Sequence, residues 1–123
     1  MTIGVWNVRG MNAFKKKQAL QEIITETRLD VAMFNETRLT EPCIFQDFFS
    51  HQTLAIKRGG CASFANTHLH RKVKALGNYL LWTRIPMGCE QLHLLNVYIE
   101  PGQTQLLVTR VNRVLEVVDD IKK

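Results

Sequence analysis

The chain has 123 residues, a length typical of one domain, and a net charge of +5 from sixteen lysines and arginines against eleven aspartates and glutamates. Its hydrophobic content of 46% and charged content of 22% are ordinary for a globular domain. No apolar run approaches the roughly 18 residues of a membrane span, and the N-terminus lacks the features of a secretory signal. The positive charge favours a polyanionic partner such as nucleic acid, with a basic surface that binds nothing as an equal alternative.

The three cysteines, Cys43, Cys61 and Cys89, are an odd number without close spacing. This pattern argues against a disulfide framework or a zinc site. It fits a reducing, intracellular location, in the nucleus or the cytoplasm. Cys61 and Cys89 lie within apolar segments, where we expect them to pack as small hydrophobic side chains.

The first third of the chain predicts a strand, a helix and a second strand. Residues 2–8 have the first strand pattern, Asn12 is a candidate cap for a helix that runs to about residue 27, and residues 31–35 form an apolar run before Glu36. A unit of this length implies parallel pairing of the two strands. Asn7 and Glu36 then lie at the sheet edge where open α/β sheets bind ligands. The simpler alternative is that Glu36 begins a solvated turn or pairs with Arg38.

Two basic groups stand out along the chain. Lys15, Lys16 and Lys17 fall in the first turn of the predicted helix, the end that the helix dipole makes unfavourable for cations. Arg71 and Lys72 belong to a polar segment, residues 67–74. We predict that these five residues contact nucleic acid, although a solvated basic face is the simpler explanation of the three lysines. The histidines at 68 and 70 are expected in a solvated loop, because no third ligand for a metal is close.

The second half of the chain predicts short strands followed by a helix. Apolar, β-like runs occur at residues 48–56, 61–65, 79–85 and 91–99. Glycines at 59–60 and at 88 divide these runs into two hairpins, which we expect to extend the parallel pair as an antiparallel meander. A final helix is expected from about Gln103, and its expected buried stripe is Leu107, Val111, Val114, Leu115, Val118 and Ile121.

Four short motifs occur in a recognisable order: residues 6–10 (WNVRG), 35–38 (NETR), 59–62 (GGCA) and 96–101 (NVYIEP). In this order and spacing they resemble the endonuclease/exonuclease/phosphatase superfamily. The residues of the first motif are most similar to those of the endonuclease domain of LINE-type (non-LTR) retrotransposons, a domain that accompanies a reverse transcriptase. The resemblance implies an α/β (α+β) fold: the N-terminal half of a two-sheet α/β sandwich, with a mixed sheet and two main helices.

The resemblance also implies a chemistry, namely hydrolysis of phosphodiester or phosphomonoester bonds with Mg²⁺ or Mn²⁺, here on DNA. By this resemblance the catalytic set is Asn7, Glu36 and Tyr98: Glu36 would bind the metal, and Asn7 would orient the metal site or a phosphate. Tyr98 would lie at the phosphate pocket, with Asn96 beside it as a phosphate-binding residue. Hard oxygen ligands and few carboxylates suit Mg²⁺, which keeps waters and substrate phosphate in its shell.

The sequence also departs from the family pattern. Asn35 stands where the family usually has glutamine, and neither the later Gly-Asp-x-Asn motif nor the Asp-His pair occurs in these residues. We therefore expect residues 1–123 to form a single partial domain that lacks the C-terminal half and is inactive alone. A non-catalytic module that binds nucleic acid or another partner, and a small α/β domain that matches by coincidence, are the alternatives.

A partial domain has a consequence for its surface. If the second sheet of the sandwich were missing, the inner face of the first would be uncovered, with Phe34, Phe64, Trp82 and Leu94 as the exposed side chains. Apolar patches of this kind mark partner surfaces or cause aggregation. We therefore expect self-association through this sheet face.

Overall fold

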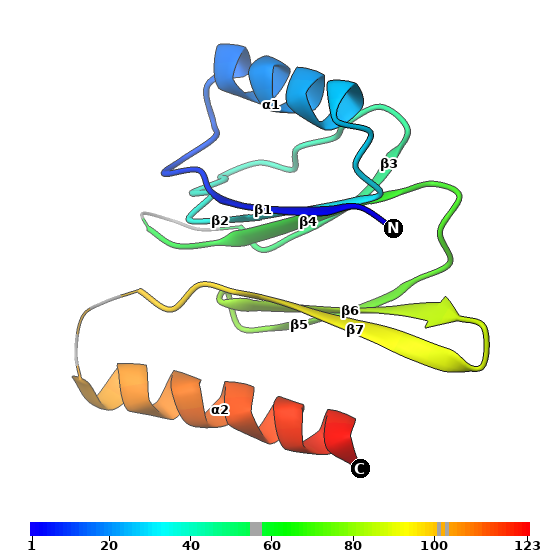
Figure 1. Ribbon diagram of the computed structural model, residues 1–123. Helices are drawn as coiled ribbons and strands as arrows, with labels where there is room; N and C mark the ends of the chain where they lie inside the picture. The colour runs from blue at the N-terminus through cyan, green and yellow to red at the C-terminus, as the bar shows by residue number, and fades with distance from the viewer. Residues whose placement is uncertain (55–57, 101, 103) are drawn as a thin grey trace.

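The computed structural model describes residues 1–54, 58–100, 102 and 104–123. Its elements form four layers, a helix, a sheet, a second sheet and a second helix, as Figure 1 shows from top to bottom. The first sheet has the strand order β1 (Ile3–Asn7), β2 (Val31–Asn35), β4 (Cys61–Asn66) and β3 (Phe48–Gln52). The second sheet has the order β5 (Lys72–Leu76), β6 (Leu80–Met87) and β7 (Glu90–Val97). The outer layers are α1 (Phe14–Glu26) and α2 (Thr104–Lys122). This architecture confirms the predicted two-sheet α/β fold.

The parallel pair predicted from the sequence is present, and its register sets the position of the candidate site. β1 and β2 pair in parallel with Asn7 opposite Asn35, and α1 makes the connection between them. β4 then pairs antiparallel with β2, and β3 with β4, which confirms the first predicted hairpin. Residues 55–56 of the expected strand lie outside the described residues, and β3 ends at Gln52.

An aromatic cluster fills the space between α1 and the first sheet. Phe34 and Phe64 are completely buried, and their ring centroids lie 5.7 Å apart. Phe45 stacks on Phe64 at 4.4 Å, and Trp6 packs on Phe34 at 5.6 Å. Such aromatic pairs add stability beyond the area that they bury.

The prediction of an uncovered sheet face was therefore wrong. Phe34 and Phe64 face α1, and the opposite face of their sheet packs on β6 and β7 through Met33, Ile85 and Leu94. Trp82 and Leu94 are half-buried. Both sheets of the sandwich belong to this chain, so the face on which the expected self-association depended is covered.

The meander prediction was wrong in one respect. The hairpin of β6 and β7 belongs to a separate second sheet, and residues 72–76, part of which we expected in a solvated loop, form its edge strand β5. Edge strands often carry charged side chains on their exposed face. Because Lys72 and Lys74 lie in β5, its sequence lacks the apolar pattern from which the other strands were predicted. Two local predictions also fail, because Cys89 is exposed at the hairpin turn and Asn12 does not cap α1.

Asn12 instead ties two loops together. Ala13 precedes α1 at the cap position without a side-chain hydrogen bond. The amide nitrogen of Asn12 donates to the Arg38 carbonyl at 2.5 Å, and its amide oxygen accepts from the Thr40 backbone at 3.1 Å. The residue thus fixes the chain that follows β2, where the first candidate site residues lie.

The last helix covers the outer face of the second sheet through a stripe that agrees with the predicted one in part. Val114 and Ile121 pack on this sheet as predicted, together with Val117, whereas Val111 and Leu115 are 40% and 53% exposed. The predicted first residue, Gln103, lies outside the described residues. Neither described helix is long and apolar enough to cross a membrane.

A matched pair of phenylalanines tests the aromatic cluster. Phe34→Ala should lower the free energy of unfolding by about 3–5 kcal/mol, because it leaves a cavity under α1. Phe14→Ala removes the same atoms from a side chain that is 77% exposed and should change the stability by less than about 0.5 kcal/mol. Urea denaturation followed by circular dichroism measures both. Equal losses in the two variants would contradict the described core.

Candidate active site

Glu36 follows β2 directly and lies at the same sheet edge as the end of β1. The parallel register aligns Asn7 with Asn35, so both strands finish together. Four of the five residues of β2 are buried, which makes it a rigid support for the carboxylate that follows. The Glu36 side chain is 16% exposed to solvent. The edge therefore presents an acidic group that solvent and ions can reach.

The loop that carries Glu36 has an unusual backbone. Glu36 and Arg38 both adopt left-handed conformations, with φ of 54° and 52°, and Arg9 on the neighbouring loop has φ of 50°. Each such residue costs of order 1–2 kcal/mol relative to the right-handed region. Left-handed residues other than glycine cluster at functional sites, where the surroundings hold them in place. The strain here is concentrated beside the candidate carboxylate.

Backbone hydrogen bonds hold this loop from both sides. On one side, Gly10 donates to the Glu36 carbonyl at 2.7 Å and Met11 to the Thr37 carbonyl at 2.9 Å. On the other, Thr37 and Arg38 donate to the carbonyls of Gly60 and Gly59 at 3.2 and 2.9 Å. Three of the recognised motifs thus meet through main-chain contacts.

Arg38 controls the charge of Glu36. Its guanidinium forms an ion pair with the Glu36 carboxylate. This contact lowers the pKa of Glu36 below the ordinary glutamate value, partial burial opposes the shift, and a hydrogen bond from the Asn7 side chain lowers the pKa further. Glu36 is therefore ionised at neutral pH, as a metal ligand must be. From the sequence, an ion pair of Glu36 with Arg38 was an alternative to a metal site at Glu36. The spacing of the two residues did not indicate that Arg38 has the largest effect on the Glu36 pKa.

Tyr98 lies at the same edge, one residue beyond the end of β7. Its backbone donates to the Tyr79 carbonyl at 2.9 Å, and its ring packs on Gly59, where an added Cβ would lie 3.8 Å from the ring. Burial raises the pKa of the Tyr98 phenol, and the charges of Glu36 and Glu100 raise it further. The phenol is thus protonated at neutral pH and is able to donate a hydrogen bond to an anionic oxygen.

Asn96 occupies a position different from the predicted one. Its side chain is buried between the two sheets, and its amide nitrogen donates to the carbonyls of Phe34 and Ala62 at 3.0 Å each. It also contacts the Ser63 hydroxyl at 3.2 Å. An amide with its donors engaged inside the sandwich does not reach a phosphate at the surface, so we assign Asn96 the role of linking the sheets.

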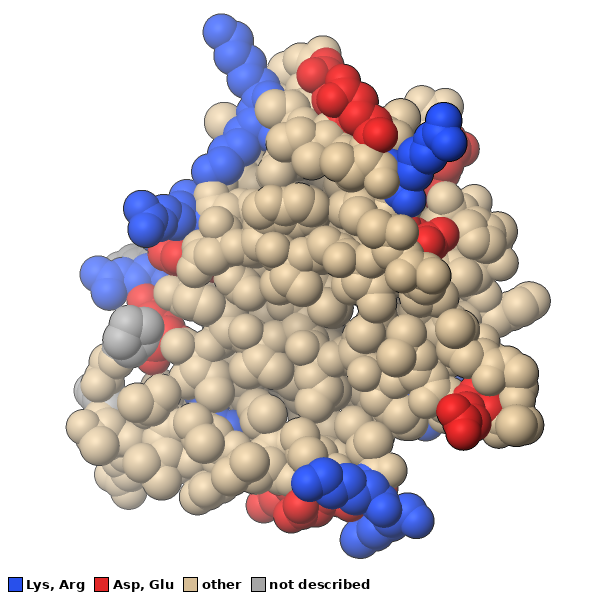
Figure 2. Space-filling view, in the orientation of Figure 1, with Lys and Arg blue, Asp and Glu red and all other residues tan. Residues whose placement is uncertain are grey.

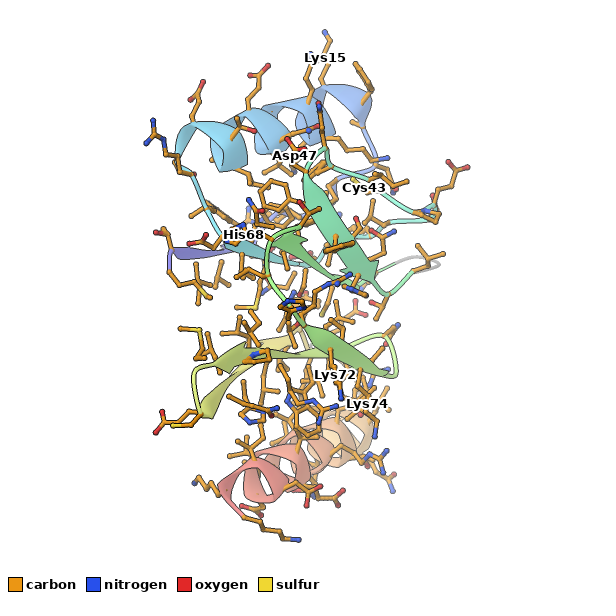
Figure 3. All side chains as sticks on the ribbon, turned by 90° about the vertical axis from the view of Figure 1, so that its right-hand side faces the viewer. Lys15, Cys43, Asp47, His68, Lys72 and Lys74 are labelled. Carbon is orange, nitrogen blue, oxygen red and sulfur yellow. The ribbon has the colours of Figure 1, made fainter. Side chains whose placement is uncertain are left out.

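The five predicted cations do not all lie at this edge. Lys15, Lys16 and Lys17 lie on the first turn of α1, and Lys16 reaches the edge, because it donates to the carbonyl of Val8, which follows Asn7. Arg71 and Lys72 lie at the start of β5 in the other sheet; Figure 3 shows Lys15 at the top of the molecule and Lys72 below its middle. Among the described arginines, Arg9 and Arg38 are close enough to affect Glu36 electrostatically.

The residues at this edge fit a magnesium ion that keeps most of its waters. No group of three or more acidic, histidine or cysteine side chains occurs among the described residues, and the carboxylates at this edge are Glu36 and, in an ion pair with Arg58, Glu100. Mg²⁺ is commonly bound by one or two carboxylates together with waters and substrate phosphates. The Asn7 amide oxygen accepts from the Arg9 backbone at 3.2 Å. A carboxylate with an amide oxygen nearby is the kind of hard-oxygen donor set that Mg²⁺ uses in proteins.

Neither His68 nor Cys61 forms a metal or nucleophilic site in the described part of the chain. His68 contacts Asn66 at 2.6 Å and Asp30 at 3.7 Å, in the polar turn before β5, as expected for a loop histidine. Cys61 is buried, and burial raises the pKa of its thiol to about 12, so it is not a nucleophile at neutral pH.

Comparison with solved structures identifies the fold. An AP endonuclease from Leishmania major superposes with a TM-score of 0.65 at 17% identity, over 88% of this chain and 42% of that chain. The endonuclease domain of TRAS1, a telomere-specific non-LTR retrotransposon, superposes with a TM-score of 0.61 at 15% identity, over 90% of this chain and 52% of that chain. Neither a scan against protein-family models nor a search of curated proteins gives a match.

Both neighbours have the endonuclease/exonuclease/phosphatase fold, and so does this chain. The resemblance seen in the four motifs is therefore confirmed at the level of the fold. The chain spans about half the length of the two structures that it matches.

The ion pair at the edge predicts a specific titration. Arg38→Asn removes the guanidinium at a position where asparagine tolerates the left-handed backbone, so the pKa of Glu36 should rise towards the ordinary glutamate value. Arg28→Asn is the matched control, because Arg28 has φ of 53° at the other end of β2. Carbon NMR of the Glu36 carboxyl during a pH titration measures the change.

The same pair should also affect stability. A lowered folded-state pKa stabilises the fold above the unfolded-state pKa, and this contribution is lost as the pH falls through the folded-state value. The stability difference between the wild type and Arg38→Asn should therefore shrink in acid. An unchanged Glu36 pKa in Arg38→Asn, or an equal change in Arg28→Asn, would contradict the assignment.

Proposed function

We propose that this chain carries the metal-binding part of a Mg²⁺-dependent phosphodiesterase site that acts on nucleic acid, and on DNA in particular. The observation that carries the proposal is the convergence of Asn7, Glu36 and Tyr98 at one sheet edge, around an ionised carboxylate on a strained loop. The fold is shared with two nucleases, one from a mobile element. An endonuclease of mobile-element type, associated with a reverse transcriptase and acting inside the cell, is the context that we propose.

Each residue has a distinct role in this proposal. Glu36 would hold the cation, Mg²⁺ or Mn²⁺, if its carboxylate were released from Arg38, and the Asn7 side chain orients that carboxylate. Tyr98 would donate a hydrogen bond from its phenol to an oxygen of the substrate phosphate. When bound, the cation supplies polarisation of the phosphoryl oxygen and stabilises the charge that develops there. Arg38, freed from Glu36, is available to pair with the phosphate itself.

A polypeptide of these 123 residues lacks part of the chemistry. The other acidic group at this edge, Glu100, is engaged with Arg58 at 3.4 Å, and no third carboxylate, histidine or cysteine joins Glu36 and Glu100 in a cluster among the described residues. General base catalysis contributes about 10²–10⁴-fold to such reactions. We therefore propose that these residues bind a metal and nucleic acid but do not cleave alone. The same observation favours the second candidate function, a non-catalytic nucleic-acid-binding module.

Metal binding tests the proposal independently of activity. Mn²⁺ added to isotope-labelled protein should broaden the amide resonances of residues 7, 36 and 98 first, because a paramagnetic ion relaxes nearby nuclei. Glu36→Gln should abolish this selectivity, whereas Glu22→Gln on α1 should preserve it. Broadening that persists in Glu36→Gln would show that Glu36 does not hold the metal, and broadening centred elsewhere would show that the metal binds at another place; either result would contradict the proposal.

A nicking assay tests the predicted lack of activity. With Mg²⁺ and supercoiled DNA, the 123-residue polypeptide and its Glu36→Ala form should give the same background, because the base is missing from both. The combined deficit should be severe even though such losses are not additive. Nicking by the wild type that disappears in Glu36→Ala would overturn this expectation and would show that these residues form a sufficient active site.

A further inference from the structure

A basic hollow lies at the opposite end of the second sheet from Glu36. It has a volume of about 240 Å³ and is lined by His70, Arg71, Lys72, Arg84, Pro86 and Gln91. β7 begins near the hollow and ends near Tyr98, so at about 3.4 Å per residue its eight residues separate the two sites by roughly 25 Å. This hollow is therefore no part of the candidate active site.

Strand register explains why the cations gather here. Lys72 on β5 lies directly opposite Arg84 on β6, and Pro86 lies opposite Gln91 on β7. Side chains two residues apart on a strand point to the same face of the sheet. Arg84 and Pro86 are two residues apart on β6, so their cross-strand partners Lys72 and Gln91 lie on that same face. The sheet thus places a lysine and an arginine side by side, with the Gln91 amide in the next row.

The charges in the hollow are not neutralised by the protein. None of its described lining residues is acidic, and neither Lys72 nor Arg84 takes part in an ion pair within the described part of the chain. Like charges directly opposite on neighbouring strands are destabilising. The pair of Lys72 and Arg84 is therefore a cost to the free protein that a bound anion would remove.

Aromatic rings hold the two arginines in fixed positions. The Arg84 guanidinium lies 5.2 Å from the Trp82 ring centroid, and the Arg71 guanidinium lies 3.3 Å from that of Phe49. Arginine stacked on an aromatic face retains its planar fork of donors, and less freedom is lost when it binds an oxyanion. The side chains on either side of Lys72 in the hollow are thus partly preorganised.

We propose that this hollow is a binding site for a phosphate group. Arg84 and Lys72 would donate charge-assisted hydrogen bonds to its oxygens, and His70 and Gln91 would complete the donor set. Phosphate geometry matches the arginine fork, and the lysine adds a point charge. The phosphate can belong to a nucleic-acid backbone or to a terminal phosphate monoester. The proposal stands on the geometry of the second sheet and is independent of the function proposed for Glu36.

NMR titration of the full 123-residue chain with inorganic phosphate, against chloride at equal ionic strength, tests the proposal. Amide shifts should saturate at residues 70–72, 84 and 91. The double variant Lys72→Gln, Arg84→Gln should bind phosphate about tenfold more weakly or worse, because it loses two charge-assisted hydrogen bonds. Lys74→Gln, on the same strand but outside the hollow, should bind within about twofold of the wild type, as expected of a screened surface charge.

Thermal unfolding gives a second readout. Phosphate should raise the melting temperature of the wild type and of Lys74→Gln more than chloride does, and should lose this effect in the double variant. Without phosphate the double variant should be at least as stable as the wild type, because the like-charge pair is gone. Shifts that do not saturate, or equal losses in the double variant and Lys74→Gln, would overturn the proposal.

Two oligonucleotides distinguish the sources of the phosphate. An eight-nucleotide DNA strand with a 5′-hydroxyl carries internucleotide phosphates alone, and the same strand with a 5′-phosphate adds a monoester. Equal shifts in the hollow with both strands identify the backbone as the ligand. Shifts with the phosphorylated strand alone identify a terminal phosphate. Shifts with neither strand and none with inorganic phosphate would refute the site.

Discussion

The buried amide of Asn96 is the contact on which the geometry of the candidate active site depends. It donates to carbonyls of β2 and β4 from the facing strand β7, and so links the three strands that end or begin at the site. Burying an amide costs free energy unless its hydrogen bonds are made; here the amide nitrogen has its partners, whereas the buried amide oxygen has none among the described residues. These bonds form only when Asn96 on β7 lies over the carbonyls of Phe34 and Ala62 in the facing sheet. Asn96 therefore favours the alignment of the two sheets that brings Tyr98 close to Glu36.

The left-handed loop depends on the same packing. Glu36 and Arg38 hold their conformations because the loops of Gly10 and Gly59 donate to and accept from the main chain between them. Those loops belong to β1 and β4, and β4 is one of the strands that Asn96 holds. The strain at the carboxylate is thus supported by contacts that reach across both sheets, which is how a marginally stable domain retains costly backbone conformations.

The sequence indicated the parts of this structure that follow from local pattern. The strand pattern of residues 2–8 and the apolar run before Glu36 predicted two strand ends at one edge, and the register of Asn7 and Asn35 agrees. The edge strand β5 was missed because Lys72 and Lys74 gave it a polar pattern. Asn96 was misjudged because an amide inside a sandwich and an amide at a phosphate look alike in sequence. The burial of Phe34 could not be predicted from the sequence, because it depends on which layer covers that side chain in the assembled fold.

Arginines give the candidate edge its chemical character. Arg38 pairs with Glu36, Arg58 pairs with Glu100, and Arg9 adds a third guanidinium that acts on Glu36. Basic and acidic side chains accordingly alternate along the left-hand side of Figure 2, where β1, β2 and β7 end in Figure 1. Three cations against two carboxylates leave the edge positive, and guanidinium binds phosphate with the same bidentate geometry as carboxylate. In the function proposed above, a substrate phosphate would compete with Glu36 for Arg38, and the released carboxylate would then be free to bind a cation.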